Sequence, residues 1–212
     1  ITVLTAVSLA ITTLSYIAYY SNNTQSRIIS PTDLVVYDEK GQAFLTALDE
    51  KQIPYEMYAF DIKELSFNFK DLIAVDITNT PFETQEQSIT VLKLSEVQQM
   101  YPEYELAHNE AIIMNYVSFF AQFLPIEAGI TASFSSENQT YEFTIKDVEK
   151  KMIVGSAVSG GGSPVLVVAD EVFKEITMQQ SIDFKKQYLV ELDEAHVEAA
   201  TALYDEMGMS KL

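Results

Sequence analysis

Three sets of residues in this chain have types or spacings that could support chemistry, and the first is a run of glycines. Residues 159–164 read SGGGSP. A phosphate-binding P-loop needs a lysine directly after its last glycine, and a dinucleotide-binding loop must follow a strand and open a helix. Here Ser163 and Pro164 follow the glycines, and the run precedes an apolar stretch typical of a strand. We therefore interpret it as a surface loop.

The second set is the histidines, His108 and His196. Catalysis by a Ser/His/Asp group would require distant residues to converge, and the chain lacks the G-x-S-x-G turn that presents such a serine. Two histidines are too few for a multi-histidine metal site. The absence of cysteine excludes disulfides, thiolate zinc sites and a cysteine nucleophile. Each histidine is therefore interpreted as a surface or structural residue.

The third set is the carboxylates, of which the chain has 31. Glycoside hydrolysis uses a carboxylate pair about 5–9.5 Å apart, a spacing that a sequence does not reveal. Saccharide sites also favour tryptophan platforms, and tryptophan is absent. No calcium-loop pattern is present. The sequence therefore assigns no catalytic residue, no metal ligand and no cofactor-binding residue, and it leaves the ligand-binding residues unknown.

The balance of charge is strongly acidic. Lysine and arginine number 13 against 31 aspartates and glutamates, which gives a formal net charge of −18. A nucleic-acid binder needs a basic face, so this class of partner is excluded. Such a charge attracts cationic ligands, although the solubility of an exported domain explains it equally well. The densest basic group is formed by Lys146, Lys150 and Lys151.

A helix expected over residues 194–209 concentrates acidic side chains on one face. Glu194, Glu198 and Asp205 fall on that face. The opposite, apolar stripe is expected to consist of Ala195, Ala199, Ala202 and Leu203. The acidic face is interpreted either as a solvated surface or as a surface that attracts a cationic ligand.

The opening of the chain has the length and polarity of a membrane span. Residues 1–25 contain no charged residue, and Ile1 in place of a methionine suggests a fragment or a processed product. Twenty helical residues span about 30 Å, the thickness of the hydrocarbon core of a bilayer. We expect 1–25 to be a transmembrane or stalk helix; a trimmed signal peptide is the alternative, but a basic leading region is missing. Because all the acidic residues follow residue 30, the simplest topology places 26–212 outside the cell.

The remainder predicts an α+β domain with one or more mixed sheets and flanking helices, in one lobe or two. A turn is expected at 38–41 and a polar loop at 78–88. Expected helices cover residues 42–52, 95–101, 170–178 and 194–209. Expected strands cover residues 34–37, 55–62, 65–77, 89–94, 111–117, 130–134, 141–145, 165–169 and 182–192.

Two segments repeat a strand, an aspartate, a helix and a second strand, namely 34–60 and 165–192. They could be two related halves of the domain, or unrelated. The expected interior includes Leu34, Val35, Val36, Ile112, Ile113, Val165, Leu166 and Val167.

Three stretches of the sequence resemble one transporter family. They are the opening ITVLTAVSLAITTLSYIAYY, LAHNEAIIMNY at 106–116 and SPVLVVADEVFKEI at 163–176. In these stretches and in its overall organisation the chain resembles the extracellular domain of the BceB-like ABC transporter permeases, which act in bacitracin resistance within the FtsX/MacB superfamily. The resemblance covers essentially the whole chain.

The resemblance implies a domain at the cell membrane that senses antimicrobial peptides and is not itself an enzyme. Such permeases protect Gram-positive envelopes against bacitracin or lantibiotics, which target lipid-linked cell-wall precursors. The implied partners are a cationic peptide or its complex with the precursor, a cytoplasmic ATPase subunit, a sensor histidine kinase and the membrane. No cofactor and no nucleic acid are expected.

Two alternatives belong to other functional classes. One is the docking domain of a different FtsX-like permease, which would bind a protein partner such as a cell-wall hydrolase. The other is a secreted enzyme with an N-terminal anchor. Salt-sensitive binding of cationic peptides would distinguish the sensing domain from the docking domain.

Overall fold

The computed structural model describes residues 32–73, 86–114, 125–136, 139–151, 153, 164–179 and 185–209. The expected membrane span at 1–25 and the glycines of the expected loop at 159–164 lie outside these residues. Within the described part, no helix combines the length and the apolar character that a membrane crossing requires.

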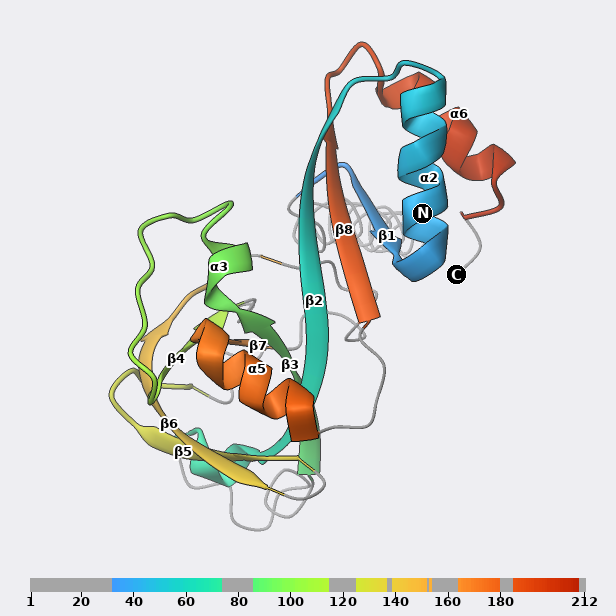
Figure 1. Cartoon of the computed structure of the whole chain (residues 1–212). Coiled ribbons are helices and arrows are strands. Elements are labelled where there is room, and N and C mark those ends of the chain that lie inside the picture. Colours follow the sequence, from blue (N-terminus) through green and yellow to red (C-terminus); the bar gives the residue numbers. More distant parts are fainter. Residues whose placement is uncertain are drawn as a thin grey trace, which may run out of the picture.

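One long strand organises the fold. β2 (Tyr55–Asn68) has 14 residues, and its first part pairs antiparallel with β8 (Lys185–Leu192). β8 pairs in turn with β1 (Leu34–Tyr37), so β1, β8 and the first part of β2 form an antiparallel sheet. The helices α2 (Asp38–Glu50) and α6 (Val197–Glu206) cover one face of this sheet (Figure 1). We call this unit the helical lobe.

The second part of β2 belongs to a closed ring of strands, here called the ring lobe. β3 (Glu86–Lys93) pairs with β2 from Lys63 to Asn68. The order continues through β7 (Val165–Val168), β4 (Glu110–Met114), β6 (Thr140–Val148) and β5 (Thr131–Ser135), and β5 returns to β2. The β3–β7 and β4–β6 pairs are parallel and the others antiparallel. The sheet is therefore mixed and has flanking helices, which confirms the predicted fold class.

Side chains along the strands of the ring lobe alternate between the inner and the outer face. Those on the inner face are apolar and fill the interior of the ring. Phe67, Ile89, Ile113, Phe134 and Leu166 are among the buried residues of this cluster. Helix α5 (Asp170–Gln179) packs against the ring and contributes three more, and the short turn η1 (Phe69–Asp71) follows β2. Each of these side chains gains roughly 1.5–3 kcal/mol on burial, so the ring has a core of its own.

The two lobes share a second core, which we call the middle cluster. It joins Phe60 and Ile62 of β2 and Leu189 of β8 to the outward-facing residues of the ring. Those outward-facing residues include Ile112 of β4 and Val165 of β7. The short helix α3 (Leu94–Val97) and the segment after it cover this cluster. Burial of one continuous apolar cluster therefore holds the lobes against each other.

Ion pairs surround Asp61, in the region of β2 where pairing passes from β8 to β3. Lys93 Nζ lies 3.1 Å from Asp61 Oδ2 and 2.9 Å from Glu96 Oε1, and Lys186 Nζ lies 3.2 Å from Asp61 Oδ1. The Asp61 backbone N–H donates to Glu96 Oε2 at 2.9 Å. Burial alone would raise the pKa of Asp61, but hydrogen bonds from both lysines outweigh it and hold the pKa below its ordinary value. Burial raises the pKa of Glu96 despite its bond to Lys93.

Several predicted boundaries were wrong, each for a local reason. No turn forms at 38–41, because Asp38 opens α2 while its side chain accepts a hydrogen bond from the Lys186 N–H at 2.7 Å. The two expected strands at 55–62 and 65–77 are one strand as far as Asn68, since β8 and then β3 pair with it continuously. The expected loop at 78–88 ends earlier, because Glu86 already pairs with Asn68; residues 78–85 lie outside the described part.

The helix expected at 95–101 is a single turn, α3. The N–H groups of Met100 and Tyr101 both donate to the Val97 carbonyl oxygen in the turn that follows, and Pro102 cannot continue a helix. The expected apolar stripe of the last helix is confirmed only at Leu203. Ala195, Ala199 and Ala202 are exposed, and the buried residues are Ala200 and Leu203. α6 begins at Val197, so its i, i+3 and i+6 positions face α2 and β8.

The two strand–helix–strand segments do not form equivalent halves. β1 and β2 both pair with β8 in one sheet, whereas β7 belongs to the ring and β8 to the helical lobe. The expected interior is largely confirmed: Val36, Ile112 and the β7 residues are buried. Leu34 and Val35 are half-buried at the edge strand β1.

Gly41 lets α2 pack closely on β8. A Cβ at this buried position would lie 2.8 Å from Tyr188 Cδ2 and 3.2 Å from the Val36 carbonyl carbon. We predict that Gly41→Ala lowers the free energy of unfolding by about 1–2 kcal/mol, because the Tyr188 side chain and α2 must move apart. This opposes the gain of about 1 kcal/mol that alanine gives a free helix. Urea unfolding measures the change in the free energy of unfolding. The control is Gln42→Ala, on the exposed side of the helix. Stabilisation by Gly41→Ala would contradict the close packing of α2 on β8.

The Asp61 carboxylate should make stability depend on pH. Asp61→Asn is expected to cost about 1–2 kcal/mol at neutral pH, because it removes the acceptor of two lysine hydrogen bonds. The folded-state pKa lies below the unfolded value of about 3.9, so this contribution is present above that pH and is lost as the pH falls through the folded-state value. The cost, measured by urea unfolding near pH 7 and again at acidic pH, should therefore be smaller at the acidic pH.

The control is Asp71→Asn, which makes the same change at an exposed carboxylate in η1. An equal cost of Asp61→Asn at both pH values would show that Asp61 acts through packing rather than through its charge.

Candidate functional site

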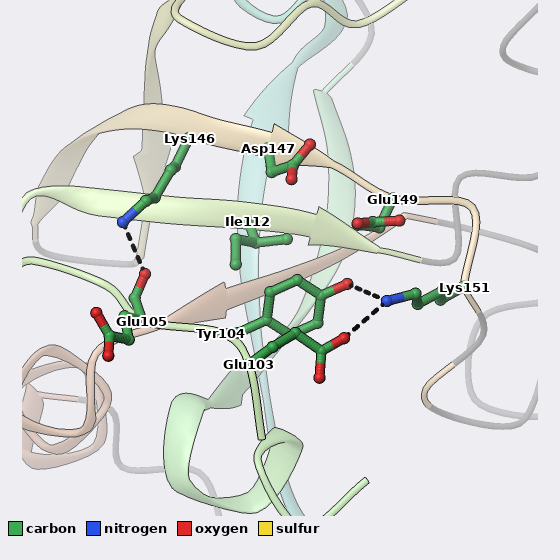
Figure 2. A pocket seen from close by; sticks show the side chains of 8 residues that line it. All are labelled: Glu103, Tyr104, Glu105, Ile112, Lys146, Asp147, Glu149 and Lys151. Atoms are coloured by element: carbon green, nitrogen blue, oxygen red, sulfur yellow. Dashed lines mark hydrogen bonds and ion pairs between the residues drawn. The ribbon is translucent and has the colours of Figure 1, made fainter. Parts of the chain in front are cut away.

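A cavity of about 410 Å³ lies on the outer face of the ring, between strands β4 and β6 and the segment that follows α3. Figure 2 shows Ile112 at its centre, the Tyr104 ring beside it and charged side chains around them. The lining consists of Glu103, Tyr104, Glu105, Ile112, Lys146, Asp147, Glu149 and Lys151. The cavity thus has an apolar floor and a charged rim.

The segment after α3 is held in place by its own sequence. Pro102 cannot continue a helix, so the chain leaves α3 and runs across the ring. Tyr104 is 8% exposed, and its ring belongs to the middle cluster. The Gln98 side chain donates to the Tyr104 carbonyl oxygen at 2.8 Å. Burial of Tyr104 therefore fixes the wall of the cavity and leaves its hydroxyl group at the rim.

A β-bulge shapes the opposite wall. Ala111 of β4 pairs with Ile145 of β6, but Ile112 pairs with Asp147, so Lys146 is the extra residue. A bulge turns side chains away from the regular alternation of a strand. Ile145 points into the ring core, while Lys146 and Asp147 both line the cavity.

Lys151 occupies a box of aromatic and acidic groups formed by Tyr101, Glu103 and Tyr104, which we call the ammonium box. Its Nζ lies 2.9 Å from Glu103 Oε1 and 3.0 Å from the Tyr104 hydroxyl oxygen. The same nitrogen lies 5.0 Å from the centroids of the Tyr101 and Tyr104 rings. The bonds to Tyr104 and Glu103 raise the pKa of Lys151, and the bond from Lys151 lowers the pKa of Glu103. The pair is therefore fully charged at neutral pH.

Lys146 is bound on the other side of the cavity. Its Nζ donates to the Glu105 carbonyl oxygen at 2.9 Å and to Glu110 Oε2 at 3.1 Å. Glu110 Oε2 also accepts the Ala107 N–H at 2.9 Å. The Ala107 N–H and then Lys146 lower the pKa of Glu110. Together these bonds pin the segment between α3 and β4 to strand β6.

The rim carries a net negative charge. Four carboxylates and two lysines line the cavity. Both lysines already have carboxylate partners, whereas Glu105, Asp147 and Glu149 form no ion pair within the described ranges. Carboxylates beside aromatic rings suit a cationic guest. In the part of the chain that the structure covers, no group of histidine and acidic side chains could hold a metal ion.

The structure brings some of the residues singled out in the sequence together. Lys146 and Lys151 lie at the cavity, whereas Lys150 is exposed and does not line it. His108 is exposed, with Nδ1 3.8 Å from Glu171 Oε1. His196 precedes α6, and its Nδ1 is buried without a hydrogen-bond partner among the described residues. Neither histidine lines the cavity.

The acidic face of the last helix is solvated. Glu194, Glu198 and Asp205 are all exposed, and Glu194 precedes the helix itself. Sequence reasoning missed the ammonium box. A local signal for the box was present in the sequence YPEY at 101–104. It places two tyrosines and a glutamate close together, around a proline that prevents a helix from continuing.

The chain is similar to one part of two curated transporter proteins. It is 22% identical over 177 residues to the bacitracin export permease protein BceB of Halalkalibacterium halodurans, with 83% of this chain and 27% of that protein covered. It is 21% identical over 181 residues to the protein of the same name from Bacillus subtilis, with the same shares covered. The predicted resemblance to the BceB-like permeases is thereby confirmed, and the chain spans about a quarter of the length of these relatives.

Other comparisons add little. No profile of a known protein family matches the chain. A crystal structure of a lipoprotein from Bacillus anthracis aligns with 81% of this chain and 90% of its own, at a TM-score of 0.44 and 9% identity. A likeness at this level supports no assignment.

The pinned segment gives a local prediction. Glu110→Ala removes the carboxylate that accepts hydrogen bonds from the Ala107 N–H and the Lys146 ammonium group. We therefore expect the Ala107 amide to exchange with solvent about tenfold faster or more. Global stability should change by less than about 1 kcal/mol, because the rest of β4 keeps its pairing. Hydrogen exchange followed by NMR measures both quantities. Glu105→Ala removes the same charge from a side chain without such bonds; equal exchange in the two variants would refute the role of Glu110.

Proposed function

We propose that this chain is the large extracellular domain of a BceB-like ABC transporter permease, and that it binds a cationic antimicrobial peptide or the complex of that peptide with a lipid-linked cell-wall precursor. The observation that carries this proposal is the match to the two bacitracin export permeases over 83% of the chain. In this proposal residues 26–212 form the outward domain, residues 1–25 tether it to the membrane, and the domain carries out no chemistry of its own.

Charge supports the proposed ligand class. The formal net charge is −18, and the rim of the cavity has the same sign. A negative field raises the local concentration of cationic peptides and speeds their encounter with the domain. The apolar floor at Ile112 and the buried ring of Tyr104 add surface that excludes water. Together they provide attraction at long range and a defined contact at short range.

The arrangement of the lobes supports a mechanical role. Both lobes share β2, and the cavity adjoins the middle cluster through Tyr104 and Ile112. In the proposed mechanism, ATP hydrolysis by a separate cytoplasmic subunit moves the spanning helices, and the attached domain frees the peptide from its target. A ligand-dependent change of the same domain would signal to a sensor histidine kinase and so confer resistance.

The proposal predicts selective binding of cationic peptides. The full 212-residue chain, held in mild detergent because of its apolar opening, is titrated by calorimetry with bacitracin, a lantibiotic and a neutral peptide. We expect the cationic peptides alone to bind, and to do so at about 0.15 M salt, where exposed charges more than about 8 Å apart are screened.

Two outcomes would contradict this prediction. Binding that disappears at about 0.15 M salt would show a charged surface without a site. An absence of peptide binding, together with capture of a cell-wall hydrolase, would favour the docking domain of another FtsX-like permease.

A further inference from the structure

We propose that the cavity is the site where the peptide binds, and that the ammonium box of Tyr101, Glu103 and Tyr104 takes a primary ammonium group of that peptide in exchange for Lys151. This inference rests on the proposed function for the nature of the ligand. It adds the site, the recognised group and a built-in competitor. The ligand class is a peptide that carries lysine-like side chains.

The box already binds the group that it is proposed to recognise. Lys151 Nζ lies within hydrogen-bond distance of Glu103 and of the Tyr104 hydroxyl, at 2.9 and 3.0 Å. It also lies 5.0 Å from two ring centroids, inside the range of about 6 Å for cation–π attraction. An ammonium group has three donors on a flexible stem, and this arrangement suits it. The geometry of the box therefore fits a primary ammonium group.

The present occupant can be reached and replaced. The side chains of Lys151 and Glu103 are 41% and 56% exposed, so this pair lies at the open rim. Exposed ion pairs contribute little to stability because water screens them. Exchange of one ammonium for another keeps the contacts of the box unchanged. Lys151 acts as a tethered competitor, with an effective concentration of the order of millimolar.

The remainder of the rim offers the peptide more than Lys151 can use. The carboxylates of Glu105, Asp147 and Glu149 form no ion pair among the residues that the structure describes. They line the same cavity as Glu103, Tyr104 and Lys151, and Figure 2 labels all of these residues. A second and a third cation of one peptide can bind there, whereas Lys151 brings a single charge. This difference gives a peptide with several cations the advantage in the exchange.

The first test removes the competitor. The full-length chain and its Lys151→Gln variant are titrated with acetylated pentalysine amide by calorimetry at about 0.15 M salt. We expect Lys151→Gln to tighten binding about fivefold or more, because the box becomes empty. Lys150→Gln is the matched control, since it removes the same charge from the exposed neighbouring residue. Equal effects of the two variants would overturn the proposal.

The second test removes the box. In the Lys151→Gln background, Glu103→Gln should abolish the gain in affinity. Glu105→Gln should retain most of it, because this carboxylate lines the cavity but does not contact Lys151. A gain that survives Glu103→Gln would show that the probe binds elsewhere.

The third test uses the unchanged protein, so it does not depend on the folding of any variant. In the NMR spectrum of the wild-type chain, the two tyrosine rings should shift the ε-methylene protons of Lys151 upfield. Saturating pentalysine should return these protons to their ordinary position, because the probe expels Lys151 from the box. An unchanged signal at saturation would overturn the exchange.

These tests separate the two proposals. If the wild-type chain binds antimicrobial peptides while the Lys151 signal and the Lys151→Gln affinity do not respond, the exchange is wrong and the proposed function stands. If pentalysine displaces Lys151 but no antimicrobial peptide binds, the box is correct and the proposed function fails.

Discussion

The fold depends on the requirement that β2 pair along its whole length with different partners. Its 14 residues pair on one edge with β8 and then β5, and on the other edge with β3. β8 pairs with β2 up to Ile62 and β3 pairs with it from Lys63 onward, so the continuous backbone of β2 links the two lobes. Asp61 and its lysines occupy the point where the partners change. The lobes are therefore joined by the shared strand, the middle cluster and a charged network.

The cavity follows from the same arrangement. The outer face of the ring must be covered because Ile112, Val165 and Val167 point outward, and the segment after α3 covers it with Tyr104. This cover is incomplete where the β4–β6 bulge displaces Lys146 and Asp147. A partly covered apolar face with charged edges results. The proposed ligand site is thus next to the contact between the lobes, where we expect a guest to influence how the lobes pack.

The sequence predicted the fold class and most elements because local patterns determine them. The apolar run at 165–168, the hairpin of β5 and β6 and the helix after Asp170 all formed as expected. Closure of the ring could not be predicted, because it depends on Ser66 and Phe67 pairing with Ser135 and Phe134, which are distant in the sequence. Pairing partners far apart in the sequence leave no local signal.

The site was less predictable than the fold, for a similar reason. The sequence identified Lys146, Lys150 and Lys151 only as its densest basic group. In the structure Lys146 and Lys151 are each paired with an acid that lies 36 or 48 positions away, and the rim around them is acidic. The charge of this surface therefore depends on tertiary contacts. Tyr101 and Tyr104 gave a local clue, but their contacts depend on Lys151, which reaches them from the segment after β6.

The most direct test of the central claim maps where a cationic peptide binds. The full-length chain is labelled with nitrogen-15, and a lantibiotic or bacitracin is added while the backbone amide shifts are followed at about 0.15 M salt. If the cavity is the site, the largest changes fall on residues 101–105 and 146–151. Smaller changes should extend to the middle cluster. Changes that spread evenly over the exposed carboxylates, or that concentrate on the acidic face of α6, would contradict it.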